Sequence, residues 1–231
     1  MLDKEQVRNR VRKRGGSSVV THSSGTLAVP AADPHAVETL AAFGRFASAR
    51  GWIEATSGNF SCRLDEGHAL ITRTGVDKGA IGAGDVAVVP LAGPIPAGLS
   101  AETPLHLARY RAAPEIGAIV HVHTVAATVL SRATLATGYV RFSGFEMQKA
   151  LAGVTTHDSI VDLPVFANAQ DTVALAATIE TWLDAVPAVP GYLLAGHGLY
   201  AWGATMADAR RHLEGFEFLL TCTLEERRLH P

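Results

Sequence analysis

The stretch SAETPLHLARYRAAPEIGAIVHVHT, residues 100–124, predicts a helix that leads directly into a buried strand. Ser100 is a plausible helix N-cap, and Pro104 suits the first helical turn. The apolar residues 117–123 that follow are typical of a strand. Side chains two apart along a strand project from the same face, so His121 and His123 point together. This stretch therefore predicts an α/β unit that carries a pair of imidazoles.

The remaining segments alternate between helical and extended patterns. Helices are predicted at residues 34–51, 126–132, 145–152 and 171–186, and from about Thr205 onward; strands are predicted at 58–64, 68–74, 85–90, 139–142, 159–166, 191–195 and 199–202. Tight turns join some of these strands and helices separate others. We therefore expect an α/β fold with a mixed, largely antiparallel central sheet and helices on both faces. No GxGxxG fingerprint supports a parallel Rossmann sheet.

Composition limits the class of protein. The 231 residues are 48% hydrophobic and 18% charged, with a formal net charge of −2, which disfavours disorder and binding to nucleic acid or an anionic membrane. Two cysteines, Cys62 and Cys222, form no disulfide framework and fit a reducing compartment such as the cytoplasm. No signal peptide or transmembrane run is apparent. We expect residues 1–30 to be a mobile extension and residues 31–231 to form a single domain.

A third histidine follows an apolar strand at residues 191–195. His197 lies between Gly196 and Gly198, which allow a tight turn and close approach to a ligand. Three imidazoles from two segments, without a cysteine partner, match an open catalytic zinc site better than a closed structural one. The alternatives are hydrogen-bonded core histidines for the pair and an ordinary turn residue for His197. Imidazole ligands alone do not exclude Fe²⁺ or Co²⁺.

Two glutamates and three loops are further candidates. Glu102 and Glu146 lie at expected helix starts, where the helix dipole alone favours glutamate, but near a metal they have the chemistry for proton transfer. Backbone N–H groups, hydroxyls and one lysine in the loops are able to hold a phosphate, although each loop is also explained as a simple turn. These candidates are Ser57, Gly58, Asn59, Thr74, Gly75, Lys78 and Ser100.

The order of these motifs resembles the class II aldolase/adducin family from about residue 35 to the C-terminus. The motifs are SGNFS (57–61), TGVDKG (74–79), SAET (100–103), HVHT (121–124), FEMQK (145–149) and GHGLYAWG (196–203). The segments GVDKG, FEMQKAL and FANAQD are similar to the dehydratase branch of the family.

The resemblance implies a three-layer αβα sandwich that binds one Zn²⁺ through His121, His123 and His197. It also implies a homotetramer with sites near subunit interfaces. The implied reaction is the dehydration of 5-methylthioribulose 1-phosphate to 2,3-diketo-5-methylthiopentyl 1-phosphate in methionine salvage. Glu146 would protonate the leaving hydroxyl. Glu102 occupies the position of the catalytic glutamate in related aldolases, where eukaryotic dehydratase relatives carry cysteine.

Two other functions are compatible with these motifs. One is a sugar-phosphate aldolase or 4-epimerase, because its chemistry needs the same metal site. The other is a non-catalytic, adducin-like interaction domain, which would be expected to have lost the metal ligands that this sequence retains.

Overall fold

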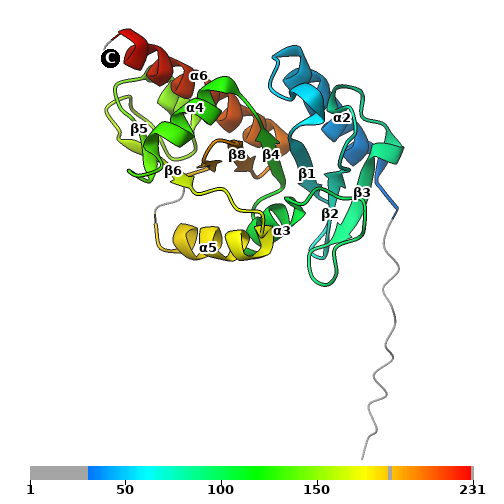
Figure 1. Cartoon of the computed structure of the whole chain (residues 1–231). Coiled ribbons are helices and arrows are strands. Elements are labelled where there is room, and N and C mark those ends of the chain that lie inside the picture. Colours follow the sequence, from blue (N-terminus) through cyan, green and yellow to red (C-terminus); the bar gives the residue numbers. More distant parts are fainter. Residues whose placement is uncertain (1–30, 187–188, 230–231) are drawn as a thin grey trace, which may run out of the picture.

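The computed structural model describes residues 31–186 and 189–229, and within them an eight-stranded sheet lies between two layers of helices (Figure 1). The strand order is β3 (Val86–Pro90), β2 (His68–Thr72), β1 (Asn59–Arg63), β4 (Ala118–Val122), β8 (Gly198–Gly203), β7 (Gly191–Leu194), β6 (Val161–Phe166) and β5 (Tyr139–Phe142). Neighbouring strands are antiparallel except β6 and β7. The expected αβα sandwich with a mixed, largely antiparallel sheet is confirmed.

The helices divide between the two faces of the sheet (Figure 1). One layer contains α2 (Pro34–Ala49), α4 (Val125–Thr134) and α6 (Met206–Leu229), and the other contains α3 (Thr103–Ala112) and α5 (Thr172–Asp184). Strand side chains alternate between the two cores, so Val120 packs toward α6 while its neighbour Ile119 packs toward α3. Within the described ranges, no helix is both long and apolar enough to cross a membrane.

Short 3₁₀ helices occupy several connections. They are η1 (Glu54–Thr56), η2 (Lys78–Ala80), η3 (Ala83–Asp85) and η4 (Glu146–Ala150). The longer helix expected over residues 145–152 is therefore wrong. The Gln148 side chain accepts a hydrogen bond from the Phe145 N–H, and Gly153 adopts a φ of +79° soon afterwards, so the chain turns after one 3₁₀ segment.

Of the two helix caps predicted from the sequence, the structure confirms the one at Asp33 but not the one at Ser100. Asp33 caps α2 as its position suggests, because its carboxylate accepts a hydrogen bond from the His35 N–H at 3.1 Å. Ser100 does not cap α3, which begins at Thr103; its hydroxyl instead accepts from the Glu102 N–H at 3.2 Å. The extension predicted for residues 1–30 lies outside the described residues.

The register of the central strands places one row of side chains across the sheet. Asn59 of β1 pairs with His121 of β4, His121 pairs with Tyr200 of β8, and Tyr200 pairs with Tyr192 of β7. Residues directly opposite one another project from the same face, here the face covered by α3 and α5.

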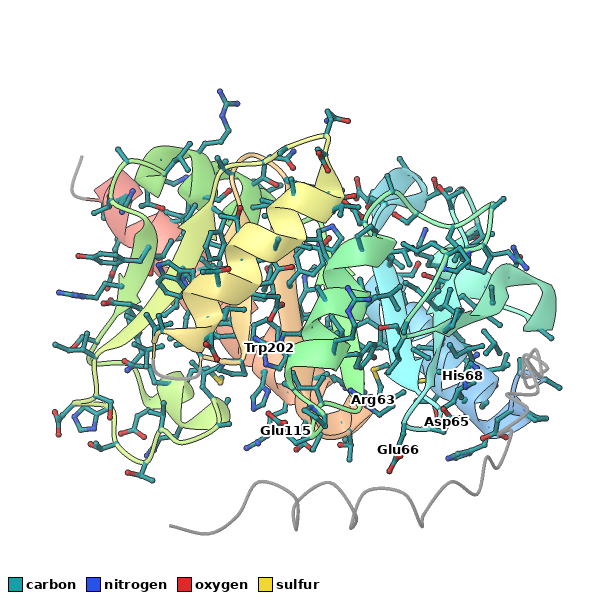
Figure 2. All side chains as sticks on the ribbon, turned by 90° about the horizontal axis from the view of Figure 1, so that it is seen from below. Arg63, Asp65, Glu66, His68, Glu115 and Trp202 are labelled. Carbon is teal, nitrogen blue, oxygen red and sulfur yellow. The ribbon has the colours of Figure 1, made fainter. Side chains whose placement is uncertain are left out.

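Helix α3 is held over this face by Arg63, which lies at the other end of β1 from Asn59. The Arg63 guanidinium donates to the carbonyls of Tyr110 and Ile116 at 2.7 and 2.9 Å, near the C-terminal end of α3. Figure 2 views the α3 and α5 layer from outside and shows Arg63 beside this helix end. The arginine thereby satisfies the Tyr110 carbonyl, which the helix leaves unpaired, and joins α3 and the segment after it to β1.

Candidate active site

The three histidines come together where β4 ends and β8 begins. His121 and His123 lie at the end of β4, and His197 lies in the turn between β7 and β8. Because β4 and β8 are antiparallel, the end of one meets the start of the other. Helix α4 holds this turn: Ser131 accepts from the Gly196 N–H at 3.0 Å, and Thr128 donates to the His197 carbonyl at 3.1 Å.

The side chains of this cluster converge on a common point. The Nε2 atom of His121 lies 2.9 Å from Nε2 of His123 and 3.4 Å from Nε2 of His197. Imidazoles bound tetrahedrally to one zinc ion would have nitrogens about 3.3 Å apart. Glu102 joins them, with Oε1 2.7 Å from Nε2 of His197 and 3.7 Å from Nε2 of His121. These four residues form the imidazole–carboxylate group, whose ligand atoms all lie within 4.8 Å of one another.

The protonation of the imidazoles suits a metal ion. The Nδ1–H of His121 donates to the Leu199 carbonyl at 3.1 Å, so its Nε2 lone pair faces the group. Burial lowers the pKa of His121 well below its usual value. Burial, and then the charge of His197, lower the pKa of His123 to about 4. Both rings are therefore neutral near pH 7, which is the form that binds metals.

Glu102 offers an anionic oxygen beside the imidazoles. Burial tends to raise the pKa of Glu102, but the hydrogen bonds from His197 and Asn59 hold it well below the usual range. The carboxylate is thus ionised. An anionic oxygen beside neutral imidazoles is a donor set typical of Zn²⁺ and similar divalent ions.

Three of the predicted phosphate-binding residues, Asn59, Ser100 and Lys78, lie next to this group. Asn59 donates through Nδ2 to Glu102 and lies 3.5 Å from the Ser100 hydroxyl. Lys78 is only 2% exposed and donates to the Thr56 carbonyl at 2.6 Å; burial lowers its pKa, whereas the charge of Glu102 opposes that shift. The Ser57 hydroxyl is buried and has no hydrogen-bond partner among the described residues.

The glycines and Thr74 of these loops differ in their surroundings. Gly58 has a φ of +72°, and a Cβ there would lie 2.5 Å from the His121 carbonyl oxygen. Gly75 has the same φ but open space beside it. The Thr74 N–H donates to the Gly98 carbonyl at 3.5 Å. Gly58 is thus required by close backbone packing at the histidines, whereas Gly75 is required only by its turn.

Glu146 lies outside the imidazole–carboxylate group. It begins η4, and its side chain is 67% exposed and pairs with Lys149 and with Nδ1 of His157, the latter at 3.3 Å. The hydrogen bond from Lys149 is the main reason that the pKa of Glu146 is lowered. Within one chain, the structure does not bring Glu146 to the three histidines.

Several residues near the site were not singled out from the sequence. His106 contacts Asn59, and Tyr200 stacks on His121. His106 lies one helical turn after Glu102, and this spacing places both residues on one face of α3. The sequence alone could therefore have predicted that His106 lies near Glu102. Ala55 and Thr56 adopt positive φ values of 53° and 62°, and such strain in residues other than glycine often occurs at functional sites.

Comparisons with known proteins agree with this geometry. Residues 38–224 match the family described as "Class II Aldolase and Adducin N-terminal domain". The chain belongs to this class II aldolase and adducin family. The expected resemblance is therefore confirmed for most of the chain.

Within the family, several curated relatives at about 50% identity are dehydratases by name. The methylthioribulose-1-phosphate dehydratase of Parvibaculum lavamentivorans is 54% identical, over 83% of this chain and 94% of its own length. The enzyme of the same name from Marinobacter nauticus is 49% identical, over 84% and 95%. Among solved structures, the l-fuculose-1-phosphate aldolase of Thermus thermophilus superposes with a TM-score of 0.71 at 29% identity, covering 85% of this chain and 96% of that chain.

Proposed function

We propose that this protein is a metal-dependent methylthioribulose-1-phosphate dehydratase of methionine salvage. It removes water from 5-methylthioribulose 1-phosphate and forms 2,3-diketo-5-methylthiopentyl 1-phosphate. The observation that carries this proposal is the imidazole–carboxylate group in a chain about half identical to dehydratases over four fifths of its length. The more distant aldolase shares the fold but only 29% of the sequence.

Zinc is the proposed cofactor, held by His121, His123 and His197. The neutral imidazoles of His121 and His123, with a half-buried carboxylate beside them, fit this ion. When bound, the ion would polarise the substrate carbonyl and make the neighbouring carbon-bound proton more acidic.

Glu102 and Lys78 have complementary proposed roles. Glu102, ionised and directed at the histidines, is the candidate to accept the proton from C3 of the substrate. The proposed phosphate-binding loops contain seven residues: Ser57, Gly58, Asn59, Thr74, Gly75, Lys78 and Ser100. Two observations support this role, since a phosphate dianion would give a hydrogen bond to the buried Ser57 hydroxyl, which has no partner among the described residues, and a compensating charge to the Lys78 ammonium, which burial destabilises.

Glu146 is the candidate to donate a proton to the departing C4 hydroxyl, which leaves as water. In one chain its lowered pKa keeps it ionised, and an ionised carboxylate cannot donate. We propose a homotetramer with sites near subunit interfaces. Burial of Glu146 against another copy would raise its pKa and let the carboxyl group carry the proton that it donates. The exposed apolar side chains of Met147 and Ile160, 38% and 63% accessible, support such a contact beside η4.

We also infer a cytoplasmic location, in keeping with the free thiols of Cys62 and Cys222.

The decisive experiment compares substrates on zinc-loaded protein. Methylthioribulose phosphate should give the absorbance of the diketone, whereas fuculose and ribulose phosphates should give no product. Cleavage of these sugar phosphates into two fragments would instead identify an aldolase. Protein that neither retains zinc nor turns over any of them would favour a non-catalytic interaction domain.

A second experiment tests Glu146. Glu146→Gln should lower turnover about 10²- to 10⁴-fold, the usual contribution of a general acid, while zinc content stays at the parent level. Turnover equal to the parent's would show that Glu146 does not transfer the proton.

A further inference from the structure

A chain of hydrogen-bonded polar side chains runs from Glu102 into the layer between the sheet and α3. Glu102 contacts the Asn59 amide, and the Asn59 oxygen lies 2.5 Å from Nε2 of His106. Nδ1 of His106 lies 2.7 Å from the Ser61 hydroxyl, which lies 2.9 Å from the Tyr110 hydroxyl. Glu102, His106 and Tyr110 are one turn apart on α3, and Asn59 and Ser61 are two apart on β1. Helix and strand periodicities thus align the five side chains.

The hydrogen-bond directions along this chain follow from chemistry. The Asn59 Oδ1 atom can only accept, so Nε2 of His106 carries the hydrogen. Burial lowers the pKa of His106 to about 4, so the ring is neutral and its Nδ1 accepts from Ser61. Because the Asn59 oxygen is engaged, its NH₂ group must face Glu102. The reversed amide would place two oxygens in contact.

We propose that His106 is a positioning residue: through the Asn59 amide, it holds the Glu102 carboxylate toward His121 and His197. This inference rests on the proposed function, in which the three histidines hold the metal and Glu102, beside them, accepts the proton from the substrate. His106, Ser61 and Tyr110 are at most 1% exposed, so this layer would pack equally well with apolar side chains. Burying polar groups in place of apolar ones has no packing benefit, but it restricts the orientation of the carboxylate at the end of the chain.

Among the described residues, no other contact gives the Oε2 atom of Glu102 the same restraint. It is the N-cap residue of α3, yet its side chain accepts no hydrogen bond from the helix. The Ser100 hydroxyl lies 3.4 Å from Oε2, farther than the Asn59 amide. One oxygen faces His197, and Asn59 is the closer of the two polar groups that hold the other. Loss of the His106 contact would let Asn59 rotate and release this second oxygen, so that the carboxylate could turn about its contact with His197.

The test uses two replacements of His106 that differ in which nitrogen they imitate. In His106→Gln the amide nitrogen replaces Nε2 and still reaches Asn59. In His106→Asn the shorter amide replaces only the Nδ1 side and reaches Ser61. Zinc dissociation constants are measured by competition with a chromophoric chelator, together with kcat and KM for methylthioribulose phosphate and the thermal midpoint of each variant.

We expect His106→Asn to weaken zinc binding and lower kcat by about 10- to 100-fold, the usual effect of losing a supporting contact around a metal site, with KM within about 2-fold of the parent. His106→Gln should retain both within about 3-fold. Equal losses in the two variants, or no loss in either, would overturn the proposal. A merely structural role would lower the two thermal midpoints without separating the two variants in zinc affinity.

A double-mutant cycle provides the second line of the test. Asn59→Ala should reproduce the loss seen in His106→Asn, and the combined variant should bind zinc no more weakly than Asn59→Ala alone. Additive losses would contradict an action through Asn59, and Asn59→Ala still decides if the His106 variants do not fold. Zinc binding without diketone formation by the parent would refute the proposed function, whereas an active parent with an unimpaired His106→Asn variant would refute the positioning role.

Discussion

The phenol ring of Tyr200 stacks on the imidazole of His121, with ring centroids 4.0 Å apart and ring planes inclined by 14°. Tyr192 stacks on the other side of Tyr200, at 4.7 Å and 21°. The strand register explains the stack, because these three residues are directly paired across β4, β8 and β7. The stack and the Nδ1 hydrogen bond to Leu199 together set the plane of the His121 ring.

Replacing Tyr200 should therefore weaken metal binding without removing a ligand. Tyr200→Leu removes the stacked ring, and we expect about a 10-fold weaker zinc affinity, as found for residues behind metal ligands. Tyr200→Phe keeps the ring and removes a buried hydroxyl that has no partner among the described residues, so affinity and stability should be retained. Competition with a chelator and thermal denaturation measure the two effects. A Phe variant as impaired as the Leu variant would refute the stacking explanation.

The two left-handed glycines should respond differently to an added methyl group. Gly58→Ala must place Cβ against the His121 carbonyl, so we expect a destabilisation above about 2 kcal/mol and weakened zinc binding. Gly75→Ala has the same φ but meets no atom within 4 Å, so only the conformational penalty of about 1 kcal/mol applies. Urea denaturation of both variants gives the difference. Equal destabilisation would mean that the contact with His121 relaxes freely.

Glu217 of α6 should make stability depend on pH. It is buried against α4 and accepts a hydrogen bond from Thr124 at 2.9 Å; burial raises its pKa to about 7 despite that bond. Between the unfolded pKa of about 4.5 and the folded value, the native state binds more protons than the unfolded state. The stabilisation is complete below about pH 4.5 and is lost as the pH rises through 7, by about 3 kcal/mol.

Glu217→Gln keeps the acceptor for Thr124 and removes the titration. At pH 8 this variant should unfold at a higher denaturant concentration than the parent, and the difference should vanish at pH 4.5. Glu226→Gln, at an exposed position of the same helix, serves as the control and should not change the pH dependence. A constant difference between Glu217→Gln and the parent across this range would show that Glu217 does not titrate there.

Lys78 should affect substrate binding more than the chemical step. Lys78→Met removes a charged donor from the proposed phosphate loops, so KM for the phosphorylated substrate should rise about 10- to 100-fold, with a smaller change in kcat. Arg228→Met removes the same charge from the exposed Arg228–Glu225 pair and should leave both constants unchanged. Steady-state kinetics at fixed ionic strength distinguish the two variants. An unchanged KM for Lys78→Met would exclude a phosphate contact.

The local sequence was sufficient for the parts of this protein that depend on short periodicities. The period of a strand puts His121 and His123 on one side, and two glycines mark the turn at His197. Alternating helical and extended patterns predicted the layered fold. The single 3₁₀ segment at Glu146 was missed because a side-chain hydrogen bond and the glycine at position 153 decided the local conformation there.

Only the tertiary structure decided which of these pieces meet. The antiparallel pairing of β4 with β8 brings His197 to a histidine 76 positions away, and the pairing of β1 with β4 places Asn59 opposite that same histidine, His121. The same packing buries His106 behind Asn59 and leaves Glu146 on the surface of the chain. Strand register depends on the packing of whole sheet faces and on hydrogen bonds between distant segments. Neither can be predicted from the residue pattern of a single segment.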